Sequence, residues 1–390
     1  MAADNFEEQF DWASLVPEVL VEVFSFLPLE DLFNVSKVCR AWRKVLGNGR
    51  IWQTLQLTLD EKFFENIIRT DENSAIVDFI CSHCDKVSNL VISVDQTQTE
   101  STATGLQILQ NLTALGSRRL RRIALAFTKE NPLFYSAKTF VDVLYDLFIV
   151  PESGSDHWEK FAGVDLSKFP VCLDDKLINV LVENHYTHLS DIRLQNYSLV
   201  CNITKDCVHN LVKKCRNLEY FSIHMSAFDG ETLKIFSTPR RRSIKVLSLF
   251  CQREDKYTSD IDSDDWASLC KTCPELRVKF YFDHTCPIFR VKEILKPIIP
   301  VSILKLRLLA TVTDLIYLAA NSYTETLEIF DVTTTSSREL DTAILFLATN
   351  CWKLRELHVW CRLAKSVVDQ ILSLCEFEKY TLAFNVECEQ

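Results

Sequence analysis

A short apolar template recurs along most of the chain and limits the possible fold more than any other feature of the sequence. It consists of an apolar residue, two spacers, an apolar residue, one spacer and a third apolar residue, as in Leu218-x-x-Phe221-x-Ile223. An apolar residue at every second position predicts a strand with one buried face. Full copies begin at Val87, Leu120, Phe161, Leu189, Leu218, Ile244, Ile303 and Leu354, and weaker copies at Leu276, Thr324 and Phe377.

The spacing of the template predicts a solenoid. Its middle residues Ile192, Phe221 and Leu247 are 29 and 26 positions apart, within the range of leucine-rich repeats. Helical spacing, as in Leu177, Val180 and Leu181, separates the strands. We therefore expect an α/β fold of about ten units, a curved leucine-rich-repeat solenoid with parallel strands on the concave side and helices on the convex side. An insert between two copies, residues 151–157, is expected to be a surface loop or a contact element.

Cysteine is abundant, with 15 residues, and its placement indicates structure more than chemistry. The N-terminal residues contain no basic flank followed by an apolar stretch, so we predict a reduced, cytoplasmic or nuclear protein. The pairs Cys81/Cys84 and Cys270/Cys273 are far more widely separated than the two pairs of a zinc ribbon. We expect neither a metal nor a cofactor. Cysteine stands three residues before a template at Cys84, Cys215, Cys273 and Cys351.

Composition argues against several classes of function. A formal net charge of −10 is unfavourable for a nucleic-acid-binding protein or a polybasic membrane anchor. Only seven glycines are present, and they form no phosphate-binding loop. No HExxH or GxSxG motif occurs, and we expect no catalytic residues. The acidic run 260–265 lacks the glycine and the final glutamate of a calcium loop, so we expect a solvated loop.

The first fifty residues predict two or three short helices. Pro17 suits the first turn of a helix, and Leu20, Val23, Phe24 and Leu27 share one helical face. A second helical pattern begins near residue 29 and continues to residue 46. A module of this size has more apolar surface than it can bury by itself. It must pack against the rest of the chain or bind a partner.

This segment closely resembles the F-box motif in the residues Leu15-Val-Pro17, Leu20, residues 24–29, Leu32, Val38-Cys39-Arg40-x-Trp42 and Trp52. With the repeats, the chain resembles F-box proteins that carry leucine-rich repeats, including irregular members such as F-box only proteins thirty-three and thirty-nine. The resemblance implies binding to the adaptor Skp1 and, through it, to a cullin–RING ubiquitin ligase. It places Pro17, Leu20, Phe24, Leu27, Leu29, Leu32 and Val38 at or behind the adaptor surface, with Cys39, Trp42 and Trp52 bracing the module.

The expected organisation is an F-box at 10–55, a connecting helix or linker at 56–75, and an irregular solenoid of about ten units at 76–390. The function that this implies is a non-catalytic substrate-recognition subunit of an Skp1–cullin–F-box ligase with an unidentified protein substrate. A Skp1-bound scaffold without ligase activity, and a receptor with a small molecule in its solenoid, remain alternatives. Alternation with core positions on the concave strands suggests the substrate contacts Arg193, Glu219, Lys245, Lys305 and Arg355.

Overall fold

The computed structural model describes residues 15–68, 73–115, 118–129, 137–151, 158–196, 198, 200–308 and 310–377. The chain divides into two compact units, residues 1–161 and 162–390. Two sequence-based expectations lie outside the described residues. They are most of the insert at 151–157 and the end of the weak template that begins at Phe377.

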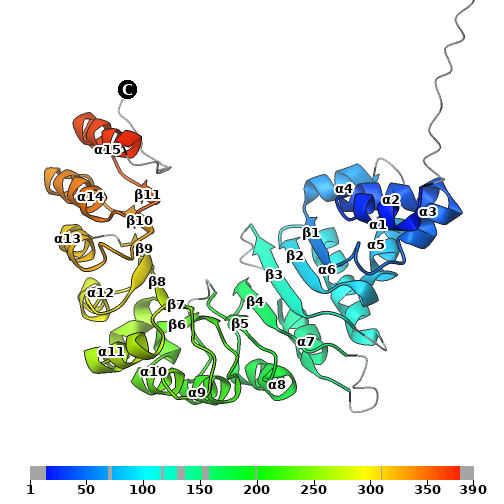
Figure 1. The fold of residues 1–390 in the computed structure, drawn as a ribbon, viewed down its shortest axis with the longest axis horizontal. Helices are drawn as coiled ribbons and strands as arrows, with labels where there is room; N and C mark the ends of the chain where they lie inside the picture. The colour runs from blue at the N-terminus through cyan, green and yellow to red at the C-terminus, as the bar shows by residue number, and fades with distance from the viewer. Residues whose placement is uncertain are drawn as a thin grey trace, which may run out of the picture. The chain divides into compact units, whose positions relative to one another are not determined.

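The first unit begins with three helices and continues with strand–helix units (Figure 1). Strands β1, β2 and β3 are parallel and pair in chain order. The segment 56–75, expected to be a connecting helix or linker, contains the last residues of β1, the helix α4 and the first residues of α5. The elements are α1 (Pro17–Phe24), α2 (Leu29–Val38), α3 (Arg40–Val45), β1 (Thr54–Leu59), α4 (Glu61–Ile68), α5 (Asn73–Cys81), a 3₁₀ turn η2 (Cys84–Lys86), β2 (Asn89–Asp95), α6 (Thr99–Ala114), β3 (Arg122–Thr128) and α7 (Ala137–Phe148).

The second unit repeats one strand and one helix or helical turn. Its parallel strands pair in chain order, and in Figure 1 they line its inner side while the helices form its outer side. The strands are β4 (Gly163–Lys168), β5 (Asp191–Arg193), β6 (Tyr220–His224), β7 (Val246–Cys251), β8 (Arg277–Phe282), β9 (Val301–Arg307), β10 (Ile329–Thr333) and β11 (Glu356–Val359). The helices are α8 (Asp175–His185), α9 (Lys205–Lys214), α10 (Gly230–Phe236), α11 (Ser263–Thr272), α12 (Ile288–Ile294), α13 (Thr313–Ser322), α14 (Arg338–Asn350) and α15 (Lys365–Phe377), with 3₁₀ turns η4 (Met225–Ala227) and η5 (Arg253–Tyr257).

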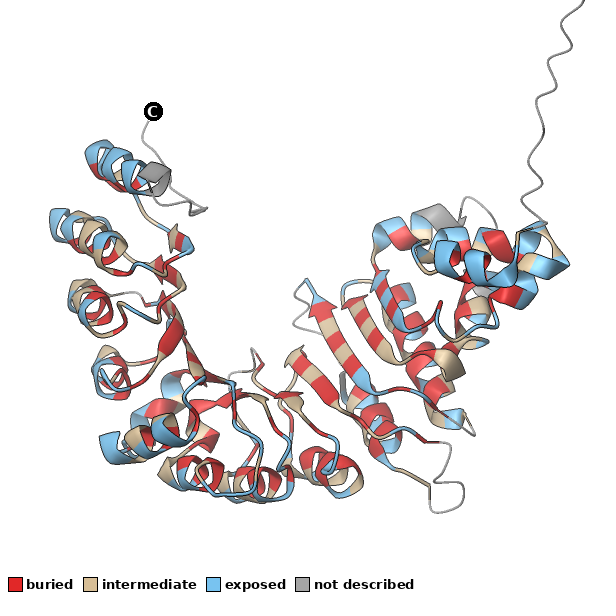
Figure 2. Ribbon diagram, in the orientation of Figure 1, coloured by how far each residue is buried: buried red, intermediate tan, exposed pale blue. Residues whose placement is uncertain are grey.

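The core lies between the strands and the helices of each unit. In β8, for example, Val278 and Phe280 are buried, whereas the alternating Lys279 and Tyr281 remain partly exposed. Figure 2 shows buried stretches on the strands and on the helices. Each fully buried aliphatic or aromatic side chain contributes roughly 1.5–3 kcal/mol of transfer free energy. The predicted α/β architecture, N-terminal helices followed by leucine-rich-repeat units, is confirmed.

Two template positions were predicted wrongly, and a β-bulge explains the first of them. Ile303 was expected in the core, but it is partly exposed, and Leu304 is buried in its place. The cause is an extra residue, Ser302, in β9: Val278 pairs with Val301, whereas the next residue of β8 pairs with Ile303. A bulge shifts the alternation by one residue. In β10 the core residues are likewise Phe330 and Val332, one position after the predicted Ile329.

Candidate protein-binding surfaces

The N-terminal helices are held together, and to the first repeat, by aromatic side chains. Phe24 of α1 meets Trp42 of α3 edge-on, with ring centroids 5.3 Å apart. Trp52 is buried, its indole Nε1 donates to the carbonyl of Leu46 at 2.8 Å, and its ring stacks on His83 at 4.3 Å. Because His83 lies beside η2, Trp52 fixes the helices to the first strand–helix unit. Trp42 and Trp52 thus brace the module, as expected.

Cys39 separates the second and third helices. Its backbone is extended, with φ −156° and ψ 167°, and its Sγ accepts a hydrogen bond from the backbone N–H of Trp42 at 3.4 Å. The sequence pattern read this stretch as one helical face through residue 46, whereas the structure divides it into α2 and α3. A thiol acting as an N-cap acceptor produces no strong signal, because Ser, Thr, Asp and Asn are the usual caps.

The seven residues predicted to bind the adaptor lie at different depths. Leu27 and Leu29 are partly exposed, and Pro17 and Val38 are exposed. The other three, Leu20, Phe24 and Leu32, are buried. Their side chains therefore belong to the core of the helical module and not to its exposed surface.

Four exposed apolar residues beside α1 were not included in that prediction. Val16, Val19 and Val23 are 44–55% exposed and follow a spacing of three and four residues, and Phe26 is 79% exposed. Together with Val38 they form what we call the exposed apolar set of the helical module. Exposed apolar side chains mark interaction sites where they gather on one face. The helical spacing of Val16, Val19 and Val23 is the sequence signal that predicts this exposed face.

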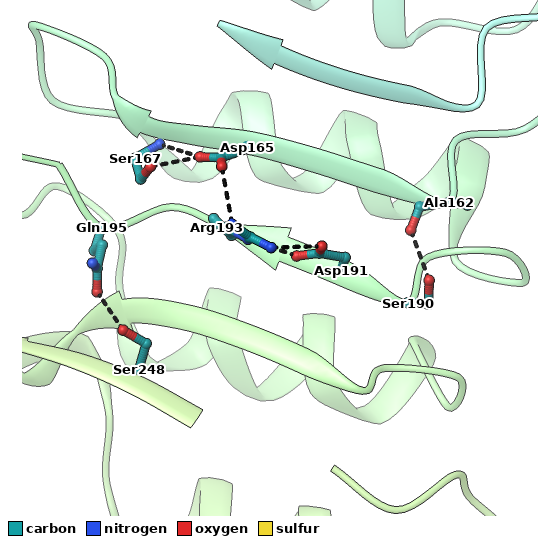
Figure 3. A network of polar contacts seen from close by, with 8 residues as sticks. All are labelled: Ala162, Asp165, Ser167, Ser190, Asp191, Arg193, Gln195 and Ser248. Carbon is teal, nitrogen blue, oxygen red and sulfur yellow. Dashed lines mark hydrogen bonds and ion pairs between the residues drawn. The ribbon is translucent and has the colours of Figure 1, made fainter. Parts of the chain in front are cut away.

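The second unit has a polar network on the inner face of β4 and β5 (Figure 3). The Nε and Nη2 of Arg193 each donate to the carboxylate of Asp191 at 3.0 Å, and Nη1 lies 3.4 Å from Asp165. The guanidinium also covers the ring of Tyr220 at 4.2 Å. Burial opposes the charge, but the bonds to Asp191 raise the pKa of Arg193 above its ordinary value. The charge of Arg193 is therefore already balanced by two carboxylates.

A shallow hollow lies beside this network. Its volume is about 150 Å³, below the roughly 300–1,000 Å³ of typical small-molecule sites, so it gives little support to a small-molecule receptor. Ser248 Oγ donates to Gln195 Oε1 at 3.0 Å at its edge (Figure 3). The lining residues are Ser167, Lys168, Gln195, Asn196, Phe250 and Tyr281.

Strands β8 and β9 each carry a lysine beside an aromatic ring. The ammonium of Lys279 in β8 lies 5.2 Å from the ring centroid of Tyr220. In β9, Lys305 lies 5.6 Å from the ring centroid of Tyr281 and 3.5 Å from the carboxylate of Asp331. The inner face of β8 and β9 thus combines cations with aromatic rings, an arrangement that cation–π attraction favours.

The five predicted substrate contacts separate into two groups. Arg193 and Lys305 lie within strands and alternate with buried residues. Glu219, Lys245 and Arg355 each lie one residue before a strand, so alternation along the strand does not apply to them. Lys245 Nζ is 2.8 Å from Glu219, and Arg355 pairs with the carboxylate of Glu328. These three therefore form ion pairs at the helix-to-strand corners. Alternation counted from the buried residues within each strand predicts other residues on the inner face, namely Asp165, Tyr220, Lys279 and Tyr281.

In each cysteine pair considered for zinc, the second residue, Cys84 or Cys273, is buried, whereas the first, Cys81 or Cys270, is partly exposed on a helix. Cys84 is buried, and burial raises the pKa of its thiol to about 12, which disfavours the thiolate that binds metal. Within the described ranges, no three His, Cys, Asp or Glu side chains gather as a metal site. Nor does any helix in this part of the chain have the length and apolarity needed to cross a membrane.

Comparisons with known proteins agree with this architecture. Residues 12–58 match the family model described as F-box-like. The chain is homologous to F-box/LRR-repeat proteins over most of its length. F-box/LRR-repeat protein 8 of Mus musculus is 29% identical over 378 residues, which cover 96% of each chain. The Homo sapiens protein of the same name is 26% identical, again over 96% of each chain. F-box/LRR-repeat protein 21 of Ovis aries is 24% identical over 70% of this chain and 60% of its own length.

The residues of the F-box-like match coincide with the N-terminal helices of the structure. The matched range contains α1, α2 and α3 in full, and it ends within β1, the first strand of the sheet of the first unit. The exposed apolar set of the helical module therefore lies inside the F-box-like domain. The inner-face lysines lie in the leucine-rich-repeat part that the F-box/LRR-repeat relatives share.

Proposed function

We propose that this protein is a substrate-recognition subunit of an Skp1–cullin–F-box ubiquitin ligase. In this proposal the F-box-like domain binds Skp1, and the inner face of the second unit binds a protein substrate. The observation that carries the proposal is an F-box-like domain in which Val16, the residue before α1, and Val19 and Val23 within α1 are exposed. An apolar set that the chain does not cover itself supports burial against a partner.

The proposed mechanism is effective concentration. The F-box-like domain anchors the receptor to the adaptor, and the repeats hold a substrate lysine close to the conjugating enzyme that carries ubiquitin. Tethering converts a bimolecular encounter into an intramolecular one and raises the effective concentration to the millimolar range for short links. In this proposal the receptor positions the reactants, and the ligase complex performs the bond chemistry.

The adaptor interaction is testable with an exposed residue. Leu32 is unsuitable because it is buried, so a carboxylate there would unfold the module. We predict that Phe26→Asp, at a site 79% exposed, weakens Skp1 binding at least about tenfold by placing an unpaired carboxylate in an apolar interface. The measurement is the affinity of the purified full chain for Skp1 by calorimetry.

Phe289→Asp is the matched control. Phe289 is 48% exposed on α12, so this variant makes the same chemical change outside the F-box-like domain. It should bind Skp1 with parental affinity, and both variants should retain the parental circular dichroism spectrum. Failure of the folded parent to bind Skp1 would contradict the proposal. Skp1 binding without ubiquitination of any bound protein in a reconstituted ligase would instead favour a scaffold without ligase activity.

A further inference from the structure

The inner face of β8 and β9 is basic within an acidic protein. Arg277, Lys279, Lys305 and Arg307 alternate with buried residues on the two strands, whereas the chain has a formal net charge of −10. Among the residues that the structure describes, Lys305 pairs with Asp331, and no acidic side chain forms an ion pair with the other three. The charges of Arg277, Lys279 and Arg307 are therefore available to a partner of the opposite sign. The ammonium of Lys305 has three donors, so it can bind a second carboxylate beside Asp331.

Lys279 is the best-defined member of this group. Its side chain is partly buried, and burial, followed by repulsion from Arg193, lowers its pKa. Glu328 and Asp191 act in the opposite direction, but neither forms an ion pair with Lys279. A partly desolvated ammonium without a counter-ion is unfavourable, and an incoming carboxylate would stabilise it.

The arrangement of the cations suits separate carboxylates better than a phosphate. Phosphate is best bound by the bidentate fork of arginine, but the fork of Arg193 already holds Asp191. The cations two residues before Tyr281 on β8 and paired with Tyr281 on β9 are the lysines Lys279 and Lys305. Lys279 pairs in register with Ile303, and Lys305 lies two residues further along β9. Strand geometry puts the two lysine positions roughly 8 Å apart. Alternate side chains of an extended peptide are about 7 Å apart.

An apolar site lies next to the lysines. Tyr281 follows Lys279 on the same face of β8 and pairs in register with both Phe250 and Lys305. Phe250 and Tyr281 also line the hollow of about 150 Å³, which has room for one side chain. A ligand with two acidic residues on the lysines would thus place a neighbouring apolar residue against aromatic rings.

We propose that the inner face of β7, β8 and β9 binds an extended acidic segment of a partner protein. Two carboxylates at positions i and i+2 contact Lys279 and Lys305, and a neighbouring apolar side chain enters the hollow beside Phe250 and Tyr281. This inference deepens the proposed function, because it names the class of substrate segment that the receptor would take. Peptide binding itself needs no adaptor, so it can be tested separately from Skp1.

The test is selection from a displayed random twelve-residue peptide library on the purified full-length chain. We expect enriched peptides to carry Asp or Glu at i and i+2 beside an aromatic or aliphatic residue. Replacing both acids of a selected peptide by Gln or Asn should weaken binding to the parent protein about tenfold or more. This comparison requires no protein variant, so it stands even if a substitution in β8 prevents folding.

Protein variants locate the site. Lys279→Met keeps the aliphatic stem, removes the charge and should weaken the selected acidic peptide about tenfold, whereas Lys279→Arg should retain binding. Lys213→Met, an exposed lysine on α9, is the matched control and should bind as the parent does. The proposal is overturned by selection without acidic enrichment, by no enrichment, or by equal binding to folded Lys279→Met. Skp1 affinity measured on the same preparations separates this failure from failure of the ligase proposal.

Discussion

The carboxyl group of Asp255 lies inside the second unit, at the start of η5. Its side chain is buried, Oδ2 accepts from the backbone N–H of Gln252 at 2.7 Å, and Oδ1 has no hydrogen-bond partner. Burial raises the pKa of Asp255 to about 7, although the bond from Gln252 acts in the opposite direction. His224 shows the reverse effect, because burial lowers its pKa to about 4. Sequence patterns could not reveal either residue, since burial of a polar side chain depends on tertiary packing.

The raised pKa of Asp255 predicts that the stability of the folded protein depends on pH. Its folded pKa exceeds the unfolded value of about 4, so the folded state binds more protons between pH 4 and 7. The contribution of Asp255 to the free energy of unfolding is therefore fully present below about pH 4 and is lost as the pH rises through 7. Asn keeps the oxygen that accepts from Gln252 but cannot ionise. We predict that Asp255→Asn has a higher free energy of unfolding than the parent at pH 8, by on the order of 2–4 kcal/mol, and a smaller difference at pH 5.

Urea unfolding of both proteins at the two pH values measures this difference. His224 contributes stability that falls as the pH drops from about 6.5 towards 4, opposite to Asp255. Because His224 is present in both proteins, its contribution cancels when the variant is compared with the parent. An advantage of Asp255→Asn that is the same at pH 5 and pH 8 would refute the raised pKa.

At the scale of elements, the helix-to-strand corner is the most regular part of the repeat. Cys215, Cys273 and Cys351 each end a helix, and each backbone N–H donates to the carbonyl of the leucine four residues earlier at 2.8–3.0 Å. All three side chains are buried, so a small, nearly apolar side chain fits this tight turn. The sequence predicted these corners because the cysteine keeps a fixed distance from the following strand.

The corner cysteines should resist alkylation in the folded protein. Burial raises the pKa of the Cys84, Cys215 and Cys351 thiols to about 12, and the thiolate is the reactive form. Among the cysteines that the structure describes, we predict that iodoacetamide at pH 8 labels the partly exposed Cys172 and Cys361 before the corner cysteines, which are labelled only after addition of denaturant. Mass spectrometry of tryptic peptides provides the measurement. Early labelling of Cys215 or Cys351 in native buffer would contradict the corner geometry.

Other parts of the elements could not be predicted from the sequence. The alternation of apolar residues located most strands, but the bulge at Ser302 moved the core position from Ile303 to Leu304. A bulge arises from pairing with the neighbouring strand, which a local pattern does not contain. A local pattern also could not predict the surroundings of three expected substrate contacts. Glu219, Lys245 and Arg355 precede their strands, and their ion pairs depend on residues in adjacent repeats.

At the scale of the whole molecule, the two proposed binding functions belong to different units of the chain. Phe26 lies in the first unit, and Lys279 lies in the second. Because substitutions that share no partners usually act independently, adaptor binding and peptide binding should be separable. A receptor that works by effective concentration nevertheless needs both activities on the same chain.

We therefore predict that each of two variants loses a different binding activity, and that both slow ubiquitination. Phe26→Asp should lose Skp1 binding and keep parental affinity for a selected acidic peptide, and Lys279→Met should do the reverse. In a reconstituted cullin–RING reaction, a lysine-containing protein fused to that peptide should be ubiquitinated at least about tenfold more slowly with either variant than with the parent. Phe289→Asp and Lys213→Met should support the parental rate. A Lys279→Met reaction at the parental rate, despite lost peptide binding, would show that capture at the inner face does not deliver the substrate.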